Sequence, residues 1–372
     1  MVRGLAAILV VLTHINSWEG KYLGKHALTP SWFYFGYVGV DVFFVISGFI
    51  MVFIQPTPIN SRPAYLRFII HRLTRIYPPV WVVMLTLLPV WCRHPNWFNN
   101  FAGNHVNLLS SFLLLPQGYV PLLGVAWTLI HEVYFYWVVS FALLFAVKGR
   151  WIFGGLWFSI ILATNCLWGD DGFGPNRFLQ VAFSPFSLTF LLGYFIGLLR
   201  DPIRRAPLFL ALLCLALGLG GMAYGVTIPW PTQIGVYPDN NHLFRFMACG
   251  LPAALLILSA IALERHLPEH LLNFDFLGDI SYATYLIHLP FITGFYLLFS
   301  KLHWISPVAV AGAAVVCFTT CLLTSAAFHY YLEINLTRKC RQFLETIFHL
   351  RDSGRVAAAA QTFRKPSPPV DS

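Results

Sequence analysis

Apolar stretches of about twenty residues recur along the whole chain, each bounded by charged residues, proline or glycine. A helix of about twenty residues matches the thickness of the hydrocarbon core of a bilayer, and a segment in lipid must satisfy its backbone hydrogen bonds internally. The sequence therefore predicts an all-α, polytopic bundle of about ten transmembrane helices. The predicted spans cover residues 3–19, 33–54, 76–92, 121–147, 151–168, 178–199, 207–224, 244–263, 280–299 and 307–332.

The composition excludes a soluble fold. Hydrophobic residues make up 58% of the 372-residue chain and charged residues only 10%, against about 25% in soluble domains. The formal net charge is +9, but the basic residues lie between the apolar stretches and form no continuous basic face. We therefore expect contact with membrane lipids and no nucleic acid partner.

The positions of the basic residues predict the orientation of the chain. If the N-terminus is cytoplasmic, alternate loops put most arginines and lysines on the same side of the membrane, as the positive-inside rule requires. Both termini are then cytoplasmic. Residues 1–340 are predicted to form the transmembrane domain. Residues 341–372 are basic and rich in proline and alanine, without apolar periodicity, and we expect a disordered cytoplasmic tail.

The seven cysteines are scattered and form no CxxC pair. Cys317 and Cys321 stand one helical turn apart in an apolar segment, which is typical of small packing residues. The sequence predicts neither a disulfide framework nor a metal site, and no bound cofactor.

Ionisable side chains are costly in lipid and persist where they have a partner, a water-filled cavity or a function. In RGLAAILVVLTH, His14 follows Arg3 by eleven residues, which returns it to nearly the same helix face about 16 Å further along. An imidazole there is suited to accept a proton from a hydroxyl that attacks an acyl carbon. The alternative is an interfacial histidine bonded to a backbone carbonyl.

Glu132 lies about halfway along the fourth predicted span, in AWTLIHEVYFYW, with Tyr136 one turn further on the same face. A carboxylate at this depth needs a partner. His14 is the expected one, because Glu132 could orient its ring and stabilise the imidazolium. The alternative is a structural pair that holds two helices together.

Two arginines stand one turn apart in HRLTRIYPP, and two prolines follow after two further residues. Arg72 and Arg75 are expected at the cytoplasmic mouth of the third helix, where two guanidiniums could clamp the phosphates of a nucleotide-like donor. The alternative is a positive flank that only sets the topology.

Three further residues are candidates for supporting roles. Asp41 begins the second span at a depth similar to that of His14, and it could accept a hydrogen bond from that imidazole or cap the helix. Trp127 could line a pocket or simply pack. His288 falls in mid-helix before Pro290, which suggests a polar interior.

Taken together, these segments resemble the acyltransferase 3 family, bacterial integral-membrane enzymes that O-acylate sugars and other acceptors. The matching stretches run in the family's order and span most of the chain. They are RGLAAILVVLTH (3–14), GVDVFFVISGF (39–49), HRLTRIYPPVW (71–81), WTLIHEVYFY (127–136) and LGDISYATYLIHLP (277–290).

The resemblance implies roles for five residues. His14 and Arg3 match an R-x10-H motif whose histidine takes part in catalysis, Glu132 matches a functional glutamate, and Arg72 and Arg75 would help to hold acyl-CoA. The implied protein is a multi-pass enzyme of the bacterial inner membrane. It would transfer an acyl group, usually acetyl, from acyl-CoA as co-substrate to a hydroxyl of a cell-surface or lipid-linked carbohydrate.

A transporter or flippase for a lipid-linked sugar is the alternative function. Ten helices with polar residues at mid-depth would suit it. Such proteins often carry helices broken by glycine or proline at corresponding positions of two halves, and this sequence has no such symmetry.

Overall fold

The computed structural model describes residues 1–98, 104–168, 173–227, 242–268, 275–302 and 306–350, and the regular secondary structure of these residues is entirely helical. The predicted all-α fold class is confirmed for this part of the chain. The α-helices are α1 (Val2–Leu23), α2 (Gly39–Phe53), α3 (Arg62–Arg93), α4 (Leu108–Leu113), α5 (Trp127–Ala142), α6 (Val147–Trp168), α7 (Arg177–Ala182), α8 (Phe186–Leu198), α9 (Arg200–Arg204), α10 (Leu208–Thr227), α11 (His242–Arg245), α12 (Leu251–Leu263), α14 (Phe276–Asp279), α15 (Ser281–Phe299), α16 (Pro307–Phe328) and α17 (Ile334–Ile347).

Nine helical segments of the described chain are long and apolar enough to cross a membrane, and each overlaps one of the predicted spans. The predicted span 3–19 has no counterpart in this set. It corresponds to α1, which carries Arg3, His14 and Glu19 among its apolar residues. The nine segments are Phe35–Phe53, Arg62–Arg93, Gly124–Ala142, Val147–Trp168, Arg177–Leu198, Leu208–Gly225, Leu243–His266, Ser281–Leu302 and Pro307–Ile347.

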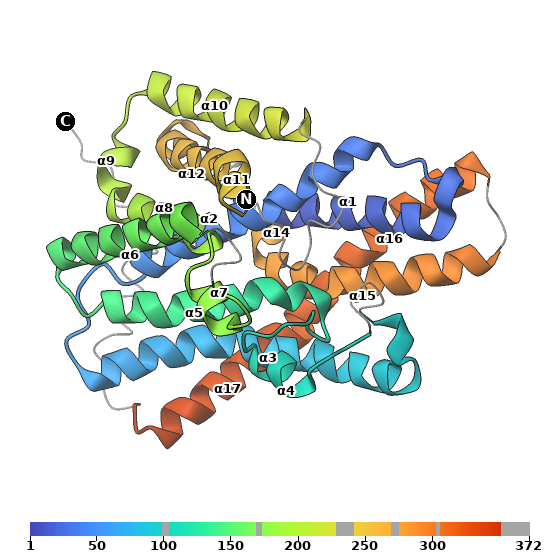
Figure 1. Cartoon of the computed structure of the whole chain (residues 1–372), viewed down its shortest axis with the longest axis horizontal. Helices are drawn as coiled ribbons and strands as arrows, with labels where there is room; N and C mark the ends of the chain where they lie inside the picture. The colour runs from blue at the N-terminus through green and yellow to red at the C-terminus, as the bar shows by residue number, and fades with distance from the viewer. Residues whose placement is uncertain (99–103, 169–172, 228–241, 269–274, 303–305, 351–372) are drawn as a thin grey trace.

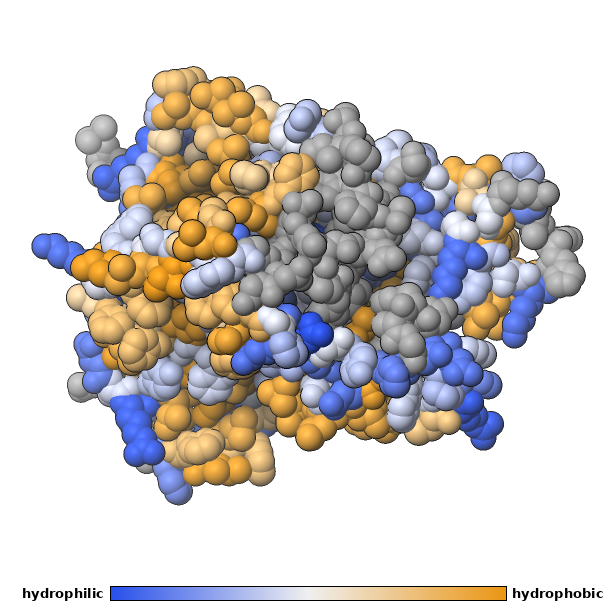
Figure 2. Space-filling model, viewed as in Figure 1, coloured by the Kyte–Doolittle hydropathy of each residue, from blue (hydrophilic) through white to orange (hydrophobic). Residues whose placement is uncertain are grey.

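Apolar side chains also cover much of the outer surface of the bundle. Ile152, Leu156 and Ile160 are exposed along α6, as are Phe209 and Leu213 on α10. Figure 2 shows hydrophobic surface over the region of these two helices, at the left and top of the view. Exposed apolar area of this extent is expected where lipid, rather than water, surrounds the helices.

α2 and α8 pack with their backbones in close contact because each helix presents a glycine to the other. A Cβ added at Gly48 would lie 1.9 Å from the carbonyl oxygen of Phe190, and one added at Gly193 would lie 1.9 Å from that of Val45. Small residues allow such close approach between membrane helices. The contact fixes the position of α2, from which Ser47 reaches α5.

Arg150, in the first turn of α6, ties together the chain at one end of the bundle. Its side chain is fully buried and donates to the carbonyl oxygens of Gln55 and Thr57, both at 2.8 Å, in the loop between α2 and α3. It also donates to the carbonyls of Leu143 and Phe145 after α5. A buried guanidinium is tolerated here because carbonyl oxygens surround it.

α3 starts earlier than the sequence predicted. It begins at Arg62, where the Ser61 hydroxyl accepts a hydrogen bond from the backbone N–H of Ala64 (3.3 Å) and caps the helix, and it continues through Pro78 and Pro79. The charged HRLTR segment is therefore part of the helix. Since the rise is about 1.5 Å per residue, Arg72 and Arg75 lie roughly 15–20 Å from the start of α3.

The last helix also extends past a predicted boundary. α17 crosses residue 340, continues to Ile347 and packs along α3. Figure 1 shows the two helices side by side in the lower part of the molecule. Residues 351–372, the rest of the predicted tail, lie outside the described residues.

Candidate active site

α1 carries Arg3 near its start and His14 beyond its middle. Figure 1 shows α1 running from the N-terminus, near the centre of the molecule, toward one end. The half-buried His14 places Nδ1 2.9 Å from the carbonyl oxygen of Val10. A carbonyl can only accept a hydrogen bond, so Nδ1 carries the proton and Nε2 of the neutral ring keeps its lone pair. The sequence offered two interpretations of His14, a base or a histidine bonded to a backbone carbonyl. The structure shows the carbonyl bond, and this bond still leaves Nε2 available to accept a proton.

The neighbour of His14 is His288 of α15. The ring centroids are 4.8 Å apart and the rings meet edge to face at 69°. His288 is fully buried, and its Nδ1 lies 3.0 Å from the carbonyl oxygen of Thr284. Within the described chain, the buried Nε2 of His288 has no hydrogen-bond partner. We call His14 and His288 the histidine pair.

Glu132 of α5 is bound by two hydroxyls and not by His14, so the predicted pairing of these two residues is wrong. Tyr136, one turn further along α5, donates to Glu132 Oε1, and Ser47 of α2 donates to the same oxygen at 3.0 Å. The sequence correctly put Tyr136 on the same face as Glu132. It missed Ser47, because a contact between two helices depends on how they are rotated against each other.

The predicted donor-binding arginines gather around Glu132. Arg3 interacts electrostatically with Arg75, Glu132 and Glu333, and Arg72 interacts with Arg75 and Glu132. We call these five residues the arginine–glutamate cluster. It contains three guanidiniums and two carboxylates, so it is positively charged and suited to an anionic ligand. Because Arg3 and His14 are about 16 Å apart along α1, the cluster is well separated from the histidine pair.

Asp41 does not orient His14. Its Oδ2 accepts a hydrogen bond from Arg245 Nη2 at 2.9 Å, and the two side chains are 0% and 8% exposed. The Arg245 guanidinium also lies 5.1 Å from the ring centroids of both Tyr37 and Phe186. Asp41 therefore belongs to a buried ion pair between α2 and the end of α11, 204 residues apart in sequence.

Glu333 is a buried acidic residue that the sequence reasoning missed. It ends a π-helical segment, His329–Glu333, between α16 and α17, and His329 Nδ1 lies 2.8 Å from its Oε2. π-helical turns within α-helices are frequent at functional sites. The available signal was an ionisable residue directly after an apolar stretch, but the predicted span ended at residue 332 and left it outside.

Trp127, at the start of α5, is part of the aromatic packing. Its ring centroid lies 5.3 Å from that of Phe186 and 6.5 Å from that of Phe44. It contacts the ring of His131 as well, at 6.0 Å. These contacts favour the packing interpretation of Trp127.

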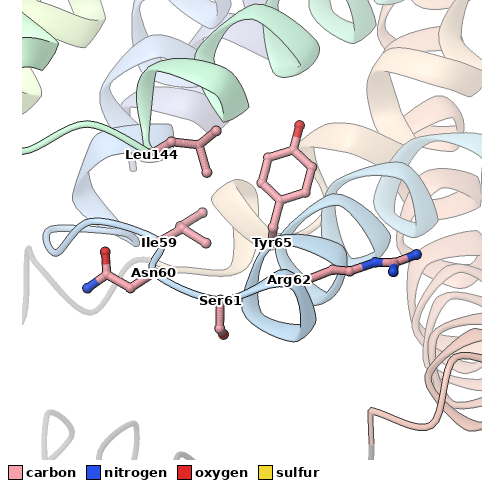
Figure 3. Close-up of a pocket in the computed structure, with 6 residues that line it drawn as sticks. All are labelled: Ile59, Asn60, Ser61, Arg62, Tyr65 and Leu144. Atoms are coloured by element: carbon pink, nitrogen blue, oxygen red, sulfur yellow. The ribbon is translucent and has the colours of Figure 1, made fainter.

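A shallow hollow opens beside the start of α3 (Figure 3), and the Arg62 side chain points away from it. It contains none of the predicted site residues. No three His, Cys, Asp or Glu side chains of the described residues come together as a metal site. The hollow is lined by Ile59, Asn60, Ser61, Arg62, Tyr65 and Leu144.

Comparison with known proteins agrees with the resemblance. The sequence profile of a family described as an acyltransferase domain matches residues 1–326. The exopolysaccharide production protein ExoZ of Rhizobium meliloti (strain 1021) is 30% identical over 269 residues, which are 69% of this chain and 76% of that protein. The peptidoglycan O-acetyltransferase OatA of Listeria monocytogenes is 29% identical over 154 residues, 40% of this chain and 20% of that protein. No solved structure matches the chain.

The family match includes every residue of the histidine pair and all of the arginine–glutamate cluster except Glu333. Together with the nine membrane-capable helical segments found among the described residues, it identifies an integral membrane acyltransferase. This chain belongs to the acyltransferase 3 family.

Proposed function

We propose that this protein transfers an acyl group, usually acetyl, from acyl-CoA to a hydroxyl of a cell-surface or lipid-linked carbohydrate. The observation that carries the proposal is the geometry of His14. Its Nδ1 is held by the Val10 carbonyl and its Nε2 is left with a lone pair, on the same helix that brings Arg3 to the arginine–glutamate cluster. ExoZ is named as an exopolysaccharide production protein and OatA as a peptidoglycan O-acetyltransferase, which supports a carbohydrate acceptor.

The donor would bind along α1. Its phosphates would lie near Arg3, Arg72 and Arg75, whose positive charge exceeds the charge of the two glutamates. The pantetheine arm is a flexible chain with two amide units, and in extended form it has the length to carry the thioester from the cluster to His14. In this proposal the donor binds from the cytoplasm and its thioester reaches His14. The acceptor would reach His14 from the opposite side of the membrane.

The chemical step needs one base and no bound cofactor. His14 Nε2 takes the proton of the acceptor hydroxyl while the oxygen attacks the thioester carbonyl carbon. The carbon–sulfur bond then breaks, and the proton on His14 passes to the departing thiolate, which gives the ester and free CoA. His288 acts as a positioning residue, because its edge-to-face contact holds the His14 ring in place.

The test is labelled acetyl transfer by the wild-type protein. Purified protein in phospholipid nanodiscs is incubated with radiolabelled acetyl-CoA and envelope glycans from a strain that lacks the gene. We expect label in the glycan, and mass spectrometry of glycans from the parent strain should show an acetyl group that the deletion strain lacks. In sealed proteoliposomes, a lipid-linked glycan that crosses the membrane without gaining an acetyl group would favour the lipid-linked sugar flippase instead.

A further inference from the structure

α17 and the π-helical residue before it present a polar stripe, of which the proposed function uses only Glu333. Glu333, Thr337, Arg341 and Glu345 follow one another at intervals of four residues, so they share one face of the helix. All four are buried or half-buried, whereas Arg338 on another face is exposed. The stripe lies beyond residue 326, where the family match ends.

The stripe faces α3. His71 Nε2 of α3 lies 2.7 Å from Glu345 Oε1, which fixes how the two helices align. The helices run in opposite directions (Figure 1), so Arg341, one turn before Glu345, lies one turn further along α3 than His71. This position is beside Arg72 and Arg75, and Arg341 interacts electrostatically with both. Three guanidiniums therefore meet between α3 and α17.

The acidic members of the stripe are bound by histidines, and Glu345 also interacts electrostatically with Arg341. Glu345 is bound to His71 and Glu333 to His329. Among the described residues, Arg72, Arg75 and Arg341 form no salt bridge.

Three polar atoms between these helices, Arg72 Nε, Arg341 Nε and Thr337 Oγ1, are buried without a hydrogen-bond partner in the described part of the chain. Buried donors without a partner are unusual and costly. The arginines also outnumber the carboxylates that interact with them, Glu132 and Glu345. The unpartnered donors and this excess of positive charge together indicate a site for an anion with several acceptor oxygens.

We propose that Arg341 and Thr337 of α17 complete a phosphate site with Arg72 and Arg75, and that its ligand is a phosphate group of the acyl-CoA donor. This inference rests on the proposed function. A phosphate offers the oxygens that guanidinium N–H groups and a hydroxyl can bind together. We favour the donor over a lipid headgroup because the site continues, through Arg72 and Arg75, into the arginine–glutamate cluster and so toward His14.

The test compares Arg341→Gln with Arg338→Gln, which removes an exposed arginine from another face of the same helix. Both are reconstituted in phosphatidylcholine nanodiscs, and their melting temperatures are measured to confirm folding. Binding of CoA and of pantetheine, which lacks the phosphates, is then measured by competition against labelled acetyl-CoA. We expect Arg341→Gln to weaken CoA binding about tenfold while pantetheine binding changes less than twofold. Arg338→Gln should resemble the wild type, and Arg341→Lys should retain an intermediate affinity for CoA.

Equal loss of CoA and pantetheine affinity would overturn the phosphate site, as would unchanged CoA affinity in folded Arg341→Gln protein. If Arg341→Gln reduces the amount of phosphatidylglycerol that the protein retains in mixed phosphatidylcholine–phosphatidylglycerol nanodiscs, but not the affinity for CoA, the ligand is a lipid headgroup and the inference is wrong. The proposed function can fail while this inference holds. That would be the result if Arg341→Gln weakens CoA binding as expected but the wild-type protein transfers no acetyl group.

Discussion

Replacing Asp41 separates two roles for this residue. The sequence allowed Asp41 to orient His14, but the structure pairs it with Arg245 at 2.9 Å. If it oriented His14, Asp41→Ala would slow catalysis in a protein of normal stability. In the ion pair, the same change leaves the Arg245 guanidinium buried without its counter-charge. We expect the loss to appear in stability, with activity per folded molecule largely retained.

The expected magnitude follows from burial. Asp41 is 0% exposed and Arg245 only 8%, and breaking a buried pair on one side costs about 3–5 kcal/mol. The rings of Tyr37 and Phe186 contact the guanidinium in the wild type and in the variant alike. Their contribution is therefore the same in both proteins and does not change the difference in stability. Asp41→Asn keeps an acceptor oxygen for Arg245 and should cost less, about 1.5–3 kcal/mol. Changing both partners, in Asp41→Leu with Arg245→Met, removes both charges and should cost less than half the sum of the single variants.

The assay is reversible unfolding by SDS in mixed micelles, which gives a free energy of unfolding for each variant and the coupling energy of the pair. Acetyl transfer is measured on the same samples and divided by the folded fraction. A single variant with wild-type stability would refute the ion-pair role. So would a double variant that costs as much as the two single variants together, because the two residues would then act independently.

Two further predictions concern the packing of α2 and the arginine–glutamate cluster. Gly48→Ala should destabilise the fold by about 1–3 kcal/mol or more, because the new methyl group would lie 1.9 Å from the Phe190 carbonyl oxygen. Gly312→Ala, whose methyl group would have no neighbour within 4 Å, is the control. Equal melting temperatures of the two variants would contradict the close packing of α2 and α8. Glu132→Gln keeps an acceptor oxygen for Tyr136 but removes one negative charge from the arginine–glutamate cluster. CoA should therefore bind roughly twofold to tenfold more tightly at low salt. Weaker CoA binding by the folded variant would contradict the electrostatic role of Glu132.

Local features of the site were predictable from the sequence, and long-range ones were not. The spacing of Arg3 and His14 follows from a single continuous helix, as does the contact of Tyr136 with Glu132 one turn away. Nothing in a helical period identifies which residue of another helix will be opposite. His288 is 274 residues from His14 in sequence, and their contact depends on how α1 and α15 rotate against each other.

The limits of the predicted spans caused the remaining errors. Hydropathy predicts that α3 begins at residue 76 and that the last span ends at residue 332, but HRLTR lies inside α3 and Glu333 lies between α16 and α17. Polar residues can occupy these positions because α3 packs against α17 and the π-helical turn before it, and not against lipid alone. Hydropathy measures the preference of a segment for lipid and carries no information on such pairing.

The most direct test of the proposed chemistry is the activity of folded protein without the His14 imidazole. His14→Ala is prepared in nanodiscs beside the wild type, and transfer from labelled acetyl-CoA to envelope glycan is measured together with the affinity for CoA. We predict that transfer falls by about 10²–10⁴-fold, while CoA affinity stays within about twofold because the arginine–glutamate cluster is intact. Transfer at the wild-type rate by the folded variant would contradict the role of His14 as the base.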